Sequence, residues 1–117
     1  MRRYLLLIYH NELEQAQLTP EELDTEYGGY VAFEENIRQK DILLSSGALL
    51  PSRTVTTIQV REGRVHTTDG PLLQTKEQLC GFYLLNVQHF DEAITWAAKA
   101  ASLTGRVIEI RPAIEFT

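Results

Sequence analysis

The sequence has a single cysteine, Cys80, among 117 residues, so no disulfide can form within one chain. A chain without a disulfide framework is typical of a reducing compartment, and we expect a cytoplasmic protein. Positive charge is also scarce, because 11 Lys and Arg stand against 16 Asp and Glu and the net charge is −5. This deficit argues against a direct nucleic-acid partner, since cations hold the phosphates in such complexes.

Long apolar runs are absent as well. The run from Tyr4 to Tyr9 has six residues, far fewer than the roughly 20 that a helix needs to cross a bilayer. His10, Asn11 and Glu12 follow it where a signal peptide would have a small-residue cleavage site. We therefore expect neither a membrane span nor a signal peptide, and we interpret the run as a strand.

The composition that remains is typical of one globular domain. Hydrophobic residues make up 44% of the chain and charged residues 23%, which is ordinary for a folded protein. The length suits one domain with a modest core. We expect a single domain over residues 1–117.

The first half of the chain predicts a strand, a helix and a second strand. After the strand over residues 4–9, Thr19 suits a helix cap, Pro20 the first helical position, and Glu22 completes a capping box. The double glycine Gly28-Gly29 inside this helix indicates either close packing or a kink. The stripe expected to face the core is Leu23, Tyr27, Tyr30, Val31, Phe33, Glu34 and Ile37.

The second half predicts a hairpin, a strand, a helix and a last strand. Residues 54–61 and 64–68 read as strands joined by the turn Glu62-Gly63. After the strand over 79–87, a helix is expected to begin near Asp91 and to end at Gly105. The residues on its expected buried face are Phe90, Ala93, Ile94, Ala97, Ala98 and Ala101. With strands at 42–50 and 107–111, the order predicts an α+β fold, the ferredoxin-like split βαβ arrangement with an inserted hairpin.

Two of the predicted strands are apolar on both faces. These are residues 4–9 and 79–87, whereas residues 107–111 alternate between apolar and polar. A strand that is apolar on both sides needs cover on both sides, and two helices can cover only one. We therefore expect a homodimer in which a second copy covers the other face.

Familiar catalytic signatures are missing. The sequence has no Walker-type glycine loop, no G-x-G-x-x-G, no G-x-S-x-G and no H-E-x-x-H. The three histidines share no ligand spacing, so we expect no metal site and no cofactor. Cys80, in an apolar strand, is interpreted as a small buried hydrophobe rather than a nucleophile.

The densest polar stretch runs from His66 to Glu77 and contains Asp69. In one interpretation Asp69 caps its own turn in a solvated loop. In the other, Asp69 projects into a cleft with Lys76 and Glu77 beside it, where an ionised carboxylate next to a cation can orient or deprotonate a small ligand. His66 then counts among the candidate binding residues.

A second polar group lies on the last strand, where Glu109 and Arg111 share a face. They are expected to be exposed, paired with each other, or part of the same cleft as Asp69. Arg111 is suited to clamp a carboxylate, and Arg53 and Lys76 are further cations available to hold a small anion.

At this point the sequence resembles a known family. Thr68-Asp69-Gly70-Pro71, then Thr75-Lys76-Glu77 and Gly81-Phe82-Tyr83, are similar to the YCII-related proteins of the DGPF-type branch. The resemblance covers essentially the whole chain and implies two ferredoxin-like subunits paired as a dimeric α/β barrel. Leu72 stands where the branch motif has phenylalanine, and Asp41 stands where relatives tend to have glycine.

The resemblance also implies site residues, although no established activity comes with it. The wider family is similar in fold to small lactone isomerases, and a histidine–aspartate pair has been proposed there as catalytic. Its aspartate matches Asp69, and the place of its helix histidine is taken by Tyr30, which is a poor general base near neutral pH. Genes of this branch often lie beside extracytoplasmic-function sigma factors.

Three hypotheses follow. The first is a small-molecule enzyme with isomerase- or lyase-like acid/base chemistry, in which Asp69 is catalytic and Tyr30, Lys76 and Arg111 position the substrate. The second is a non-catalytic ligand-binding or accessory protein linked to an extracytoplasmic-function sigma factor. In the third, the Asp69 turn is purely structural.

Overall fold

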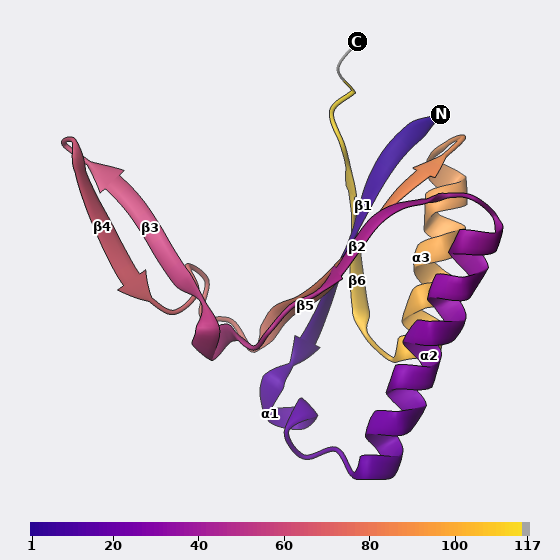
Figure 1. Cartoon of the computed structure of the whole chain (residues 1–117), viewed down its shortest axis with the longest axis horizontal. Coiled ribbons are helices and arrows are strands. Elements are labelled where there is room, and N and C mark those ends of the chain that lie inside the picture. The colour runs from indigo at the N-terminus through magenta and orange to yellow at the C-terminus, as the bar shows by residue number, and fades with distance from the viewer. Residues whose placement is uncertain (116–117) are drawn as a thin grey trace.

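In a computed structural model, which describes residues 1–115, a four-stranded antiparallel sheet carries two long helices on one face (Figure 1). The sheet has the order β2-β5-β1-β6. In chain order the elements are β1 (Arg2–Asn11), α1 (Glu12–Gln15), α2 (Pro20–Gln39), β2 (Leu43–Ala48), the 3-10 turn η1 (Ser52–Thr54), β3 (Thr56–Arg61), β4 (Arg64–Asp69), β5 (Glu77–Val87), α3 (Phe90–Thr104) and β6 (Val107–Pro112).

The strand order confirms the ferredoxin-like α+β fold with an inserted hairpin. The two strands that are apolar on both faces, β1 and β5, are central, and β2 and β6 lie at the edges. None of the helices within residues 1–115 has the length and apolar character needed to span a membrane.

Local signals placed the start of α2 and the end of α3 correctly. The Thr19 hydroxyl accepts a hydrogen bond from the Glu22 amide at 3.1 Å, and the Glu22 carboxylate accepts one from the Thr19 amide at 3.0 Å, so the capping box is formed. Gly105 ends α3 in the left-handed conformation with φ 71°. Asp41, after α2, is also left-handed with φ 58°.

The predicted buried faces of the helices were partly wrong. Tyr27 of α2 is 71% exposed, and on α3 Phe90 and Ile94 are 46% and 43% exposed. The reason is the crossing of α2 and α3 at Gly29, where a Cβ would lie 2.0 Å from the Leu103 carbonyl oxygen. This close approach turns the helices so that the buried residues are Gly29, Phe33 and Ile37 on α2, and Ala93, Ala97, Ala100 and Thr104 on α3.

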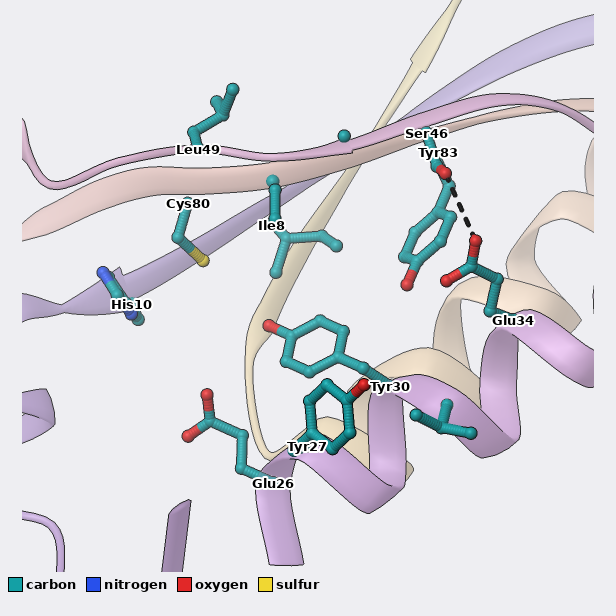
Figure 2. A pocket seen from close by; sticks show the side chains of 14 residues that line it. Ile8, His10, Glu26, Tyr27, Tyr30, Glu34, Ser46, Leu49, Cys80 and Tyr83 are labelled. Atoms are coloured by element: carbon teal, nitrogen blue, oxygen red, sulfur yellow. Dashed lines mark hydrogen bonds between the residues drawn. The ribbon is translucent and has the colours of Figure 1, made fainter. Parts of the chain in front are cut away.

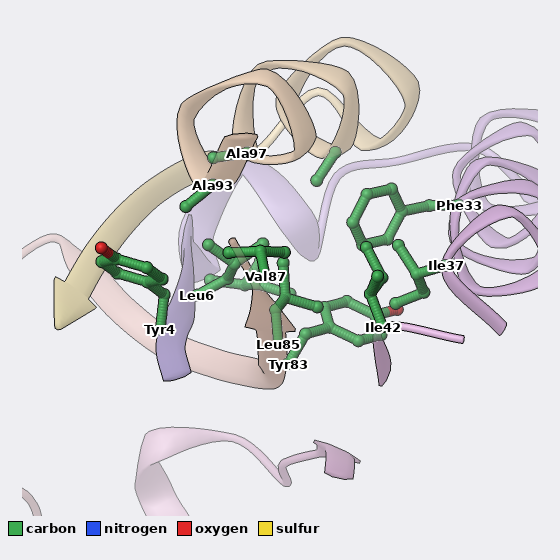
Figure 3. Close-up of a cluster of buried hydrophobic side chains, with 12 residues drawn as sticks. Tyr4, Leu6, Phe33, Ile37, Ile42, Tyr83, Leu85, Val87, Ala93 and Ala97 are labelled. Carbon is green, nitrogen blue, oxygen red and sulfur yellow. The ribbon is translucent and has the colours of Figure 1, made fainter. Parts of the chain in front are cut away.

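The core lies between the helices and the sheet (Figure 3). Leu6 of β1 and Leu85 of β5 are fully buried, and Phe33 meets Tyr83 edge to face with ring centroids 5.0 Å apart. The small alanines of α3 let that helix approach the sheet closely. This packing accounts for one face of the sheet only.

The opposite face has no cover from residues 1–115, the part of the chain that the structure describes. Along β1, the residues Leu5 and Leu7 alternate with the buried core positions and remain partly exposed. Their cross-strand partners are Leu84 and Phe82 of β5, which are partly exposed as well. We call this surface, defined by these four residues, the open face.

The hairpin of β3 and β4 forms a separate two-stranded sheet. It projects away from the body on the side of the four-stranded sheet opposite the helices (Figure 1). The predicted turn is confirmed, since Glu62 and Gly63 both have positive φ, 50° and 76°. We call residues 56–69 the arm.

Candidate functional site

A pocket of about 360 Å³ lies between α2 and the edge of the sheet formed by β2 and β5 (Figure 2). Its walls are largely apolar, with Ile8, Val31 and Leu49 among them. The aromatic rings of Tyr27, Tyr30 and Tyr83 also line it. A concave, mostly apolar space with a few convergent polar groups is typical of small-molecule sites.

The polar centre of the pocket is the hydroxyl of Tyr30, which points toward Cys80 in Figure 2. The Cys80 thiol and the Arg106 guanidinium are its polar neighbours. Burial raises the pKa of Tyr30 well above its usual value, and it also raises the pKa of the Cys80 thiol. Both groups are therefore neutral at pH 7.

His10 lies on the same side of the pocket. Burial lowers the pKa of its imidazole, and the nearby charge of Arg106 lowers it further. The ring is therefore neutral at pH 7 and offers one acceptor and one donor nitrogen to a ligand. Together with Tyr30 and Cys80, His10 makes a polar patch that carries no net charge.

Behind this patch Arg106 forms a buried network. Its guanidinium makes an ion pair with Glu26 and donates a hydrogen bond to the Gln15 side chain. The side chains of Arg106 and Glu26 are only 12% and 18% exposed. Although burial opposes its charge, the neighbouring Glu26 carboxylate and Tyr30 hydroxyl raise the pKa of Arg106. The network thus places an ion pair next to the Tyr30 hydroxyl.

The other end of the pocket contains Glu34 and Tyr83. Glu34 accepts hydrogen bonds from Arg38 at 2.7 Å and from the Ser46 hydroxyl at 3.5 Å. Burial raises the pKa of Tyr83 to about 12, and the charge of Glu34 adds to this effect. Tyr83 is therefore a second neutral hydroxyl at the pocket wall.

A second pocket of about 370 Å³ lies next to the first, and His10 lines both. It contains Arg53 and Glu12. The carboxylate of Glu12 accepts hydrogen bonds from the hydroxyl and the amide of Ser52, the latter at 2.8 Å, and these bonds lower its pKa. These hydrogen bonds connect the 3-10 turn η1 to the start of α1.

The predicted site residues are distributed over several surfaces. Tyr30 lines the first pocket and Arg53 the second. Asp69 is exposed at the base of the arm and lines neither pocket, and Lys76 and Glu77 are exposed near the start of β5. His66 is exposed on β4. A single chain therefore does not bring Asp69 and Tyr30 into one pocket, and the role of Asp69 stays a prediction.

Arg111 and Glu109 lie on the same side of the sheet as the open face. They stand opposite Leu5 and Leu7 of β1 in the strand pairing. The nearby Glu109 carboxylate is the main reason why the pKa of Tyr9 is raised. Of the three alternatives for this pair, exposure is the one observed, since both residues are exposed at the sheet surface.

Sequence reasoning missed the groups around Tyr30, namely His10, Glu26 and Arg106. Their separation along the chain, with Glu26 and Arg106 paired across the fold, leaves no spacing to recognise. The one feature of the sequence that could have pointed to this network is Arg106, a charged residue directly after Gly105 at the end of the helix. Among residues 1–115, no three His, Cys, Asp or Glu side chains gather in a way that could hold a metal ion.

The fold and the pocket define a class: a ferredoxin-like α+β protein with one open sheet face and a pocket beside its first long helix. Over residues 2–117 the sequence matches the YCII-related domain, and the chain belongs to this family. It is similar to an uncharacterised protein of Rhizobium meliloti strain 1021, with 30% identity over 112 residues, which cover 93% of this chain and 90% of that protein.

Proposed function

We propose that the protein binds a small organic molecule in the pocket beside α2, with Tyr30 as the residue that orients it. The observation that carries this proposal is the convergence of Tyr30, Cys80 and His10 in an otherwise apolar pocket of about 360 Å³. All three groups are neutral at pH 7 because burial disfavours their charged forms. No lysine or arginine belongs to the described lining. These features favour a neutral ligand with a carbonyl or hydroxyl group over a small anion.

The Tyr30 pocket is tested by thermal-shift titration against a panel of lactones, small carboxylic acids and cofactor fragments. We expect neutral compounds to raise the melting temperature of the wild type. Tyr30→Phe should bind the same compound about tenfold more weakly, because it lacks the hydroxyl. Tyr27→Phe is the matched control, since Tyr27 lines the same pocket but is 71% exposed. Equal affinities for the two variants would contradict the role of Tyr30.

Acid/base catalysis with Asp69 is the second candidate function, in line with isomerase- or lyase-like chemistry. It is favoured by the exposure of Asp69 at the base of the arm, where the carboxylate is accessible to another molecule. In the same titration Asp69→Asn separates the two functions. An enzyme would keep binding and lose turnover of the bound compound, whereas a binding or accessory protein would keep binding and show no turnover in either form.

We also propose that the protein is a homodimer paired through the open face as an α/β barrel. Leu5, Leu7, Phe82 and Leu84 form a continuous apolar surface on the two central strands, and such surfaces are uncommon on monomers. We expect light scattering to give twice the chain mass of 13.3 kDa at micromolar concentration. A mass equal to one chain under these conditions would contradict the dimer.

A further inference from the structure

The arm has one apolar and one polar face. Residues directly paired across two strands project to the same side. Ile58 pairs with Thr67 and Val60 with Val65, and these positions share a face. The opposite face carries the pairs Gln59–His66 and Arg61–Arg64. The arm is therefore an amphipathic ribbon.

The apolar face of the arm is not covered by any of the described residues of its own chain. Ile58, Val60 and Val65 are 63%, 65% and 68% exposed. An isolated two-stranded ribbon is marginally stable in water unless a hydrophobic face packs on something. The alternation of apolar and polar residues thus indicates a surface that is buried in the functional protein.

The open face of the sheet is the matching surface, and both occur on the same side of the molecule. Figure 1 shows the arm beyond the sheet, opposite the helices. When two copies pair through their open faces, each arm is directed toward the partner, and the contact is made twice around a two-fold axis. A second copy of this chain therefore supplies cover for both apolar surfaces at once.

We propose that the arm packs its apolar face on the sheet of a second copy and carries Asp69 into the dimer interface. Thr56 pairs with Asp69, so the carboxylate lies on the apolar face of the arm, two positions from Ile58 and Thr67. This inference rests on the proposed homodimer. It adds that the arm of each chain covers the open face of the other. It places Asp69 in a site built by two chains, which one chain by itself does not form.

Charge complementarity indicates what Asp69 meets there. Asp69 is the charged residue among the paired positions of the apolar face of the arm. On the side of the open face, Arg111 is an exposed cation that stands opposite Leu5 in the strand pairing. The Asp69 carboxylate therefore lies against the partner subunit's Arg111, and a two-chain pair of carboxylate and guanidinium results.

Site-directed photo-crosslinking tests the placement of the arm. The single cysteine is first removed as Cys80→Ala, and a benzophenone maleimide is then attached to Val65→Cys on the apolar face. His66→Cys, its neighbour on the polar face, is the matched control. In an equal mixture of 14N and 15N protein, the Val65 label should link different chains and should attach to peptides of β1 or β5. The His66 label should give less than one tenth of that yield.

Charge reversal tests the placement of Asp69. Asp69→Arg and Arg111→Asp should each weaken the dimer about tenfold in sedimentation equilibrium, and the double variant should return within threefold of the wild type. Single variants that dimerise as well as the wild type would overturn this placement.

The outcomes separate the two levels of the proposal. If the wild type is a dimer but the label at Val65→Cys links only within one chain, or links no better than the label at His66→Cys, the arm contact is overturned. The proposed dimer is then unaffected. A monomeric wild type overturns the dimer and the arm contact together. Neither result affects the Tyr30 pocket, which is measured by ligand binding.

Discussion

Replacing Gly29 with alanine is expected to lower the free energy of unfolding by about 3 kcal/mol, which is at the upper end for overpacking a core. The added Cβ would lie 2.0 Å from the backbone carbonyl oxygen of Leu103 and 2.8 Å from its carbon. A backbone atom cannot rotate away as a side chain can, so α2 and α3 must separate. Urea denaturation at fixed protein concentration measures the loss, and we expect a melting temperature roughly 10 °C lower.

Gly28→Ala is the matched control for this experiment. Gly28 neighbours Gly29 on the same helix, but a Cβ there meets nothing within 4 Å. Because alanine is the better helix former, this variant should be more stable than the wild type by about 0.5–1 kcal/mol. A Gly29→Ala protein as stable as Gly28→Ala would show that the two helices do not cross as described.

Replacing Glu26 with alanine is expected to cost about 3 kcal/mol, because it leaves the buried Arg106 guanidinium without its carboxylate. The two side chains are 12% and 18% exposed, and the Arg106 Nε is buried without a hydrogen-bond partner among residues 1–115. Removing both charges, as Glu26→Ala with Arg106→Met, should recover part of the loss. Denaturation of the four proteins of this double-mutant cycle gives the coupling between the residues.

Glu34→Ala is the control for the loss of a carboxylate from α2. Glu34 pairs with Arg38 at 2.7 Å, but the Arg38 side chain is 64% exposed, and such pairs contribute about 0.5 kcal/mol. Equal losses for Glu26→Ala and Glu34→Ala would mean that the Arg106 network contributes nothing beyond a surface ion pair. The Glu26 variant should also weaken ligand binding, because Arg106, a neighbour of the Tyr30 hydroxyl, loses its ion-pair partner.

The fold was predictable because its signals are local. Alternation and periodicity depend on residues two to four positions apart, and capping depends on the first turn of a helix. Thr19, Glu22 and Gly105 therefore marked the helix ends correctly. The apolar character of both faces of β1 and β5 likewise predicted that these strands are central.

The candidate site was predicted only in part. Tyr30 was selected through the family resemblance and lies in the pocket, but Asp69, Lys76 and Glu77 lie outside it in the single chain. The groups that surround Tyr30 come from β1, β5 and the loop before β6. No local pattern connects residues so far apart, since their meeting depends on how the helices cross.

The sequence by itself determined the order of the main strands and helices, the positions of the central strands and the presence of the inserted hairpin. Only the tertiary structure decided which helix residues are buried, because the contact of Gly29 with the Leu103 carbonyl sets the rotation of both helices. It also decided that Arg106 reaches Glu26 and Tyr30, and that the arm projects on the side of the open face. These features depend on the packing of distant segments, which is set by the shapes of whole surfaces rather than by the spacing of residues along the chain.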